Sequence, residues 1–409
     1  MEAGDVRPVR GAEAPSERGN IVILFGSLVV VMLGFGMIIP IMPFYVEAMG
    51  ASGGALGLLM ATFALMQLIF SPLWGNLSDR IGRKPVLLIG ILGNAIAQLF
   101  FGLSTQLWML FAARALSGIL SSATLPTALA YISDTTSEEN RGGGMGVMGA
   151  AMGVGMVLGP GLGGWLANGS LSRPFFVAAG VSALMLPLVY LILPESLSQD
   201  RRSHPVGRVR GLEAGQLRRS LQRPLGYLFF LSFLLSFGLT NFEAVFGLYA
   251  LERFGYGPAQ VGTMMTVVGL TSALAQGLLA GPLTRRWGEA LVIQASLLLS
   301  AIGFLLMLTA THFATVLLTT GLFVLGNAML RPAVASLISK QAGQRQGSAM
   351  GLSNSFMSLG RIGGPIWAGF TLDINLFLPY LSGATIMAVG LLTTFHGLRR
   401  SEETTDARS

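Results

Sequence analysis

Twelve long apolar runs cover nearly all of this 409-residue chain, and they constrain its fold more than any other feature. Each run is close to the ~20 residues that an α-helix needs to cross a ~30 Å hydrocarbon core. Membrane β-strands need only ~10 alternating residues, so the run lengths favour helices. We therefore predict an all-α integral membrane protein with twelve transmembrane helices. The runs are 21–43, 55–74, 86–104, 107–132, 143–167, 174–194, 225–250, 258–283, 290–310, 313–338, 348–371 and 376–397.

The composition excludes several classes of function. Hydrophobic residues make up 52% of the chain and charged residues only 11%, which is less than half of the ~25% found in soluble domains. The chain has no Cys, and its three His form no paired metal-binding motif, so we expect no metal site and no cofactor. The sequence shows neither a nucleophile–base constellation nor a phosphate-binding Gly-rich loop, which argues against an enzyme and against direct use of ATP.

The basic residues predict the orientation of the chain in the membrane. Counting Lys and Arg in alternate loops places 21 on one side and only Arg173 and Arg253 on the other. Such a bias marks the basic side as cytoplasmic, and it puts both termini there. The net charge of +7 is then a consequence of topology, and we expect no nucleic-acid partner.

An internal repeat divides the chain into two halves. The segment 75–82 matches 281–288 at an offset of 206 residues, and Pro126 matches Pro332 at the same offset. Both halves have six predicted spans and hence the same orientation, and transporters built this way bind cargo between the repeats near the membrane midplane. The predicted parts are a cytoplasmic tail 1–20, a six-helix bundle 21–194, a cytoplasmic linker 195–224, a second six-helix bundle 225–397 and a cytoplasmic tail 398–409.

Four segments carry a family resemblance. They are 75–85 (GNLSDRIGRKP), 110–118 (LFAARALSG), 155–164 (GMVLGPGLGG) and 237–243 (FGLTNFE). They resemble the major facilitator superfamily and, within it, the twelve-helix drug:proton antiporters of the NorA/Bmr-type bacterial multidrug (quinolone) efflux branch. The resemblance implies two pseudo-symmetric bundles and a monomeric, multi-pass protein of the bacterial inner membrane. It also implies proton-coupled export of amphipathic, cationic drugs or dyes by alternating access.

The resemblance also implies a latch between the two halves. In the family, the acid of the 75–85 loop lies near the start of helix 11, here about Gly347, and the basic residue reaches the acid that ends helix 4. The latch closes the outward-facing state. The second copy has Arg285 where the first has Asp79, so we expect a weaker second latch. The residues assigned to the latch are Gly75, Asp79, Arg80, Gly82, Arg83 and Asp134.

The helix 5 segment predicts a seam at which helices approach closely. Gly removes side-chain bulk, and Pro removes a backbone hydrogen bond and kinks a helix. We therefore expect a bent, pliable helix between the halves. The residues assigned to this seam are Gly155, Gly159, Pro160 and Gly164.

Charged residues inside the spans are the candidates for proton coupling. A charge at mid-membrane costs about 3 kcal/mol on insertion scales, so it persists when it is paired, protonated or functional. Glu243 is the one acid well inside a span, and we expect it to hold a proton and a cationic cargo alternately, with Arg114 assisting. The competing interpretation is a structural ion pair of Glu243 with Arg361 or Arg331.

Aromatic and amide side chains are the candidates for cargo binding, because they suit lipophilic cations and because bare amides are unfavourable in lipid. We expect the partners of the chain to be lipophilic small molecules, protons and membrane lipid. Two alternatives stay open, a transporter for one metabolite (a sugar, a siderophore or a lipid-like solute) and a non-transporting membrane scaffold. The candidate cargo-binding residues are Phe63, Gln67, Phe237, Asn241, Asn327 and Asn354.

Overall fold

The computed structural model describes residues 17–137, 139–198, 202 and 225–406, and within these ranges every regular element is helical. Ten helical segments in the described residues are long and apolar enough to cross a membrane. The predicted tail 1–20 and the predicted linker 195–224 lie mostly outside the described residues.

The first group of helices contains the predicted first six runs. The run 107–132 is observed as two helices joined by a 3-10 turn, and α1 and α2 extend past both ends of their apolar runs where backbone hydrogen bonding continues. The elements are α1 (Glu17–Ala48), α2 (Gly53–Ile81), α3 (Arg83–Leu103), α4 (Leu107–Leu120), η1 (Ser121–Ala123), α5 (Thr124–Thr135), α6 (Arg141–Leu166) and α7 (Arg173–Ile192).

The second group differs more from the prediction. The run 258–283 and most of the run 290–310 lie in one helical segment of 50 residues, Pro258–Met307. The backbone of this segment is non-helical at Gly288, where φ is 78°. The run 348–371 lies in α13, which is too polar to count among the ten candidate spans. The elements are α9 (Gly226–Phe254), α10 (Pro258–Leu274), the π-helix η3 (Ala275–Leu279), α11 (Ala280–Met307), α12 (Phe313–Ala342), η4 (Gly343–Arg345), α13 (Gln346–Ile374) and α14 (Leu378–Asp406).

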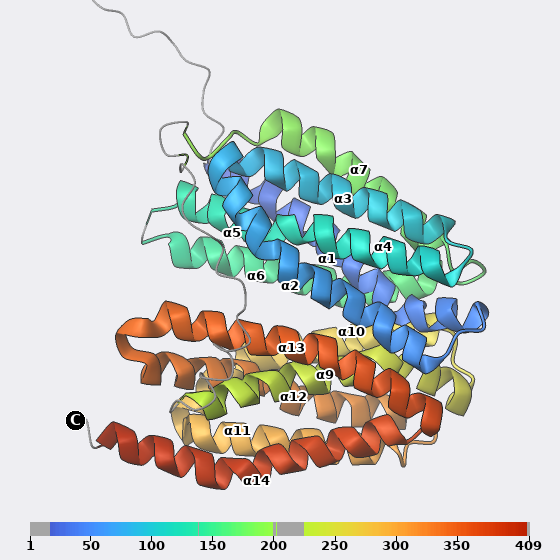
Figure 1. The fold of residues 1–409 in the computed structure, drawn as a ribbon, viewed down its shortest axis with the longest axis vertical. Coiled ribbons are helices and arrows are strands. Elements are labelled where there is room, and N and C mark those ends of the chain that lie inside the picture. The colour runs from blue at the N-terminus through green and yellow to red at the C-terminus, as the bar shows by residue number, and fades with distance from the viewer. Residues whose placement is uncertain (1–16, 138, 199–201, 203–224, 407–409) are drawn as a thin grey trace, which may run out of the picture.

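The two groups pack as separate bundles that meet at one end (Figure 1). Contact between them is made mainly by α2 against α13 and by α6 against α10. The bundles converge at the right of the view, where α2 begins and α13 ends. We call this the far end, and we call the opposite end, where α2 turns into α3, the latch end. The latch end is the predicted cytoplasmic side.

Glycines allow the backbones to touch at the far end. A Cβ atom added to Gly57 on α2 would overlap the carbonyl of Pro365 on α13, and one added to Gly262 on α10 would lie 2.5 Å from the carbonyl oxygen of Pro160 on α6. The carboxylate of Asp373 also accepts hydrogen bonds from the backbone amides of Gly53 and Gly54, at 2.7 and 2.8 Å. These amides open α2, so an acid of one bundle caps a helix of the other.

The predicted helix 5 seam has two faces. Gly155 and Gly159 on α6 lie against α1 of their own bundle, where a Cβ would come within 2.9 Å of Val29 O and 2.8 Å of Leu33 O respectively. Gly164, in contrast, lies against Gly262 of the other bundle. Gly155 and Gly159 therefore pack α6 within its own bundle, whereas the carbonyl of Pro160 and Gly164 lie against Gly262 of the other bundle. A Cβ on Gly269 of α10 would also lie 3.1 Å from the carbonyl oxygen of Met156, so the motif contacts both bundles along most of its length.

We predict that Gly155→Val destabilises the α1–α6 contact, because overpacking a close helix contact costs about 1–3 kcal/mol. Gly153→Val is the matched control on the same helix, since nothing lies within 4 Å of the Cβ position of Gly153. Thermal unfolding of the detergent-solubilised variants checks this expectation. Equal melting temperatures for the two variants would contradict it.

Candidate functional site

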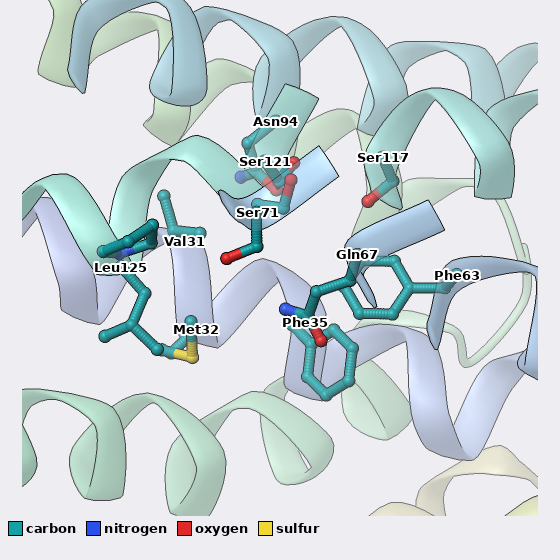
Figure 2. A pocket seen from close by; sticks show the side chains of 12 residues that line it. Val31, Met32, Phe35, Phe63, Gln67, Ser71, Asn94, Ser117, Ser121 and Leu125 are labelled. Atoms are coloured by element: carbon teal, nitrogen blue, oxygen red, sulfur yellow. Dashed lines mark hydrogen bonds between the residues drawn. The ribbon is translucent and has the colours of Figure 1, made fainter. Parts of the chain in front are cut away.

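A small cavity lined by both polar and apolar side chains lies in the first bundle. Its volume is about 60 Å³, which is room for about four or five water molecules. Helices α1 to α5 all contribute to its wall (Figure 2). The lining residues are Val31, Met32, Phe35, Phe63, Gln67, Ser71, Asn94, Ser117, Ser121, Ser122, Leu125 and Pro126.

Two of the predicted cargo residues meet at this cavity. Phe63 and Gln67 both line it, one turn apart on α2. The Phe35 ring from α1 faces them, with its centroid 5.1 Å from that of Phe63 (Figure 2). Asn94 on α3 was missed by the sequence reasoning, although an amide inside an apolar run was the available signal. It donates a hydrogen bond to Ser182 at 2.8 Å, so it is partly satisfied by α7.

Arg114 lies directly behind the aromatic wall. It is only 2% exposed, and its guanidinium carbon lies 5.1 Å from the ring centroid of Phe63 and 5.9 Å from that of Phe35. Its Nη2 donates to the Met60 sulfur at 2.8 Å. Nε and Nη1 have no hydrogen-bond partner, and no acid in the described part of the chain pairs with this cation. Cation–π contact compensates only part of the loss of hydration.

Glu243 lies in the other bundle, on α9, and is half-buried. Among the described residues it forms no ion pair within 4.0 Å and no hydrogen bond, although its charge interacts with that of Arg361. Arg331 in turn repels Arg361. The direct ion pair considered for Glu243 is therefore not made in this conformation. No group of three or more acidic or histidine side chains in the described ranges could hold a metal ion.

The other four candidate cargo residues lie outside the cavity. Phe237 is 7% exposed and packs beside Phe233. Asn241 donates to the carbonyl of Pro379 at 3.1 Å, and Asn327 donates to the carbonyl of Leu235 at 3.2 Å. Both amides therefore join helices within the second bundle. Asn354 is exposed on α13.

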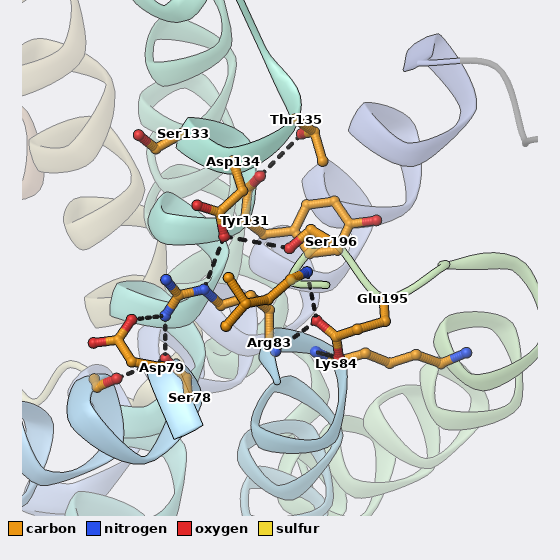
Figure 3. Close-up of polar contacts among 12 residues, drawn as sticks. Ser78, Asp79, Arg83, Lys84, Tyr131, Ser133, Asp134, Thr135, Glu195 and Ser196 are labelled. Carbon is orange, nitrogen blue, oxygen red and sulfur yellow. Dashed lines mark hydrogen bonds and ion pairs between the residues drawn. The ribbon is translucent and has the colours of Figure 1, made fainter. Parts of the chain in front are cut away.

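The latch residues form a compact group at the turn between α2 and α3 (Figure 3). Arg83 Nε lies 2.9 Å from Asp134 Oδ2, and Arg83 Nη1 lies 2.5 Å from Asp79 Oδ1. Nη1 also donates to the Ser78 hydroxyl at 2.7 Å. One guanidinium thus holds the ends of α2, α3 and α5 together. Arg80 is exposed at the end of α2.

The turn itself depends on Gly82 and on an acid that the sequence reasoning missed. Gly82 has a φ of 109°, and a Cβ there would overlap the carboxylate of Glu195. That carboxylate accepts hydrogen bonds from the amides of Arg83 and Lys84, at 2.8 and 3.1 Å, and so caps α3. Gly75, which the family resemblance assigns to the latch, lies inside α2 because this helix continues to Ile81.

The latch group does not reach across to the second bundle. Asp79 is paired with Arg83 of its own bundle, and nothing lies within 4 Å of the Cβ position of Gly347 at the start of α13. Glu289, at the corresponding turn of the second bundle, pairs with Lys340 and accepts a hydrogen bond from Ser336 at 2.9 Å. The halves are therefore joined at the far end, and each latch group is closed upon itself.

Known proteins resemble this chain over nearly all of its length. It is 34% identical to multidrug resistance protein 2 of Bacillus subtilis over 90% of this chain and 93% of the relative. Multidrug resistance protein 1 of the same organism is 35% identical, over 92% and 96%. The quinolone resistance protein NorA of Staphylococcus aureus is 29% identical, over 91% and 95%.

Solved structures give the same result for the fold. The human organic anion transporter MFSD10 superposes with a TM-score of 0.68 at 25% identity, over 93% of this chain and 100% of that one. The nucleoside transporter NupG superposes with a TM-score of 0.76 at 16% identity, over 93% and 98%. The Major Facilitator Superfamily model matches twice, over residues 24–227 and 228–408. With these matches, its repeated bundles and its apolar helices, the chain belongs to the major facilitator superfamily and is a multi-pass membrane protein.

Proposed function

We propose that this protein exports amphipathic drugs, chiefly cationic ones, in exchange for protons. The observation that carries the proposal is Glu243, a lone carboxylate about 25 Å along α9 that has no direct ion-pair or hydrogen-bond partner among the described residues. A charge at that depth is unfavourable unless it is paired, protonated or functional, and Glu243 has no direct partner among the described residues. Relatives named for multidrug and quinolone resistance support drugs as the cargo.

The transport path requires a membrane topology, and we infer twelve spans with both termini cytoplasmic. The 50-residue segment from α10 to α11 would be ~75 Å long if straight, enough to cross a ~30 Å core twice. The Gly288 break marks the end of the first crossing. Counting this segment twice and adding α13, which packs between α9 and α2, brings the ten candidate spans to twelve.

The cycle then follows from alternating access. With the latch end open, Glu243 releases its proton to the cytoplasm and binds the cation of the cargo. The latch end then closes and the glycine contacts of the far end separate, so that the cargo site opens to the outside. A proton from outside then neutralises Glu243 and displaces the cargo. One carboxylate exchanges one proton for one monovalent cation, so the cycle moves no net charge.

The cavity of the first bundle is suited to one lipophilic group of the cargo. Its volume of about 60 Å³ is too small for a whole drug, since drug-sized sites run to about 300–1,000 Å³. Aromatic and thioether side chains line it and can repack around different shapes. We therefore place the body of the cargo between the bundles, with one group against Phe63 and Gln67.

We predict that Glu243→Gln reduces proton-driven uptake of dye into inverted vesicles by about tenfold or more, because the amide cannot titrate. Downhill equilibration of the dye should persist. Glu252→Gln is the matched control, since Glu252 lies on the same helix but is exposed near its end. Undiminished uphill uptake by the Glu243 variant would exclude single-acid coupling.

We also predict that membrane potential has no effect on uptake of monovalent cations. Moving one charge through 100 mV is worth about 2.3 kcal/mol, so an electrogenic cycle would respond strongly. Collapsing the potential with valinomycin and potassium should leave uptake unchanged, while nigericin should abolish it. A large loss with valinomycin alone would show that net charge moves.

A third prediction separates the roles of two arginines. Arg114→Met should keep or raise thermal stability, because it removes a buried cation with two unpartnered nitrogens, and it should abolish transport. Arg253→Met should instead lower stability by about 2 kcal/mol or more, since Arg253 donates to Tyr249 and to the carbonyls of Leu308 and Ala310. A strongly destabilised Arg114 variant would indicate a structural role.

A further inference from the structure

The latch group has a copy of opposite charge in the second bundle. At the 206-residue offset of the repeat, four charged positions of the first bundle all reverse sign in the second. The four pairs are Asp79 and Arg285, Arg83 and Glu289, Asp134 and Lys340, and Glu139 and Arg345. The neighbouring pair Arg80 and Arg286 keeps its sign. Arg285 is thus one of four positions at which the charge is reversed. The second latch group therefore differs from the first in the sign of its charges and is not simply a weaker copy of it.

The structure shows that these positions are spatially equivalent. Gly82 and Gly288 make the same turn, with φ/ψ of 109°/160° and 78°/159°. The Arg83–Asp134 pair of the first bundle has its counterpart in the Glu289–Lys340 pair of the second. Reversal of both members leaves the attraction within each bundle intact.

Three of the inverted charges have no ion-pair partner within the described part of the chain. Glu139, Arg285 and Arg345 are exposed, and none forms an ion pair among the described residues. Arg141, next to Glu139, turns back to donate to the carbonyl of Ser133 in its own bundle, at 3.4 Å. It does not neutralise Glu139. The three free charges lie at the latch end, where the bundles do not meet.

Helix geometry shows which of these charges would meet on closure. α6 and α10 touch at the far end, where a Cβ on Gly164 would lie 2.9 Å from the Cα of Gly262. Glu139 lies 25 residues before Gly164, and Arg285 lies 23 residues after Gly262, so the two arms are ~38 Å and ~35 Å long. Because the two helices are antiparallel and the two arms are nearly equal in length, Glu139 and Arg285 approach each other when the angle between the helices decreases.

The other seam has the same construction. α2 and α13 touch at Gly57 and Pro365. Asp79 lies 22 residues after the first and Arg345 lies 20 residues before the second, or ~33 Å and ~30 Å along the helices. If the second bundle kept the charges of the first, Glu139 would face an acid at position 285 and Asp79 would face an acid at position 345. Because the sign is reversed, an acid faces a base at each seam.

We propose that Glu139 and Arg285 form an ion pair that closes the α6–α11 seam at the latch end in the outward-facing state. The inference rests on the alternating access of the proposed function. It assigns these two residues to the stability of the closed gate and not to cargo or protons. An exposed pair of this kind changes a conformational equilibrium by about two- to fivefold, which suits a gate that must reopen in every cycle.

The test uses spin labels on this chain, which has no native Cys. Asn140→Cys, at the exposed N-cap of α6, and Gly281→Cys, at an exposed position of α11, place labels near the pair. Distances measured by double electron–electron resonance in nanodiscs, without cargo or gradient, report the closed fraction directly. Glu139→Arg and Arg285→Glu should each lower that fraction by about two- to fivefold, and the double exchange should restore it. Arg173→Glu, at the far end, is the control for net charge and should change nothing.

Three outcomes would overturn the proposal: no short-distance population in the unmodified pair of labels, no effect of either single reversal, or no recovery in the double exchange. The measurement is independent of transport. If the double exchange restores the closed fraction while the protein moves no dye, the ion pair at the gate is supported and the proposed function is wrong. If dye export is normal and the single charge reversals leave the distances unchanged, the ion pair is wrong and the proposed function is unaffected.

Discussion

Close backbone contact at glycines is the constraint on which the rest of the structure depends. Helices in lipid gain no hydrophobic free energy by associating, because lipid is as apolar as their side chains, so packing and hydrogen bonding must hold them together. Gly57 against Pro365 and Gly262 against Pro160 bring the two bundles to backbone contact at the far end. Large side chains of both bundles are also buried here, because Leu248 and Leu372 of the second bundle lie in one apolar cluster with Tyr45 and Leu56 of the first. The two bundles are therefore joined both by backbone contact and by apolar packing.

The arginines show how differently this chain treats positive charge in an apolar setting. Arg83 is held by two acids, and Arg253 is satisfied by a hydroxyl and two carbonyls. Arg114 has only a sulfur atom and two aromatic faces. An unpaired buried cation is unfavourable for folding. Its position behind the cavity wall formed by Phe35 and Phe63 is the observation that supports the proposed role of Arg114 in transport.

Much of the fold could be predicted from local sequence, because the length of an apolar run and the choice of helix are properties of a short window. The membrane character was accessible in this way, whereas the family and the approach of Arg83 to Asp134 were implied by the resemblance of the motifs to the major facilitator superfamily. The cargo-binding residues were harder to predict from the sequence. Gln67 and Asn327 are both amides inside apolar runs, yet one lines the cavity and the other donates to a backbone carbonyl inside a bundle. Which of the two occurs depends on the rotation of each helix against its neighbours.

The sequence by itself determined that the chain is a repeated set of membrane helices with charged turns. The hydropathy of each run and the 206-residue spacing of the repeat can both be obtained without knowledge of the contacts between helices. Only the tertiary structure decided which end is closed, that Gly155 faces α1 while Gly164 faces α10, and that Arg114 lacks an acid. It also showed that Arg285 belongs to a charge-reversed copy of the latch, since the Glu289–Lys340 pair is visible only in three dimensions. The physical reason is that packing between helices depends on side-chain fit over distances that no sequence window covers.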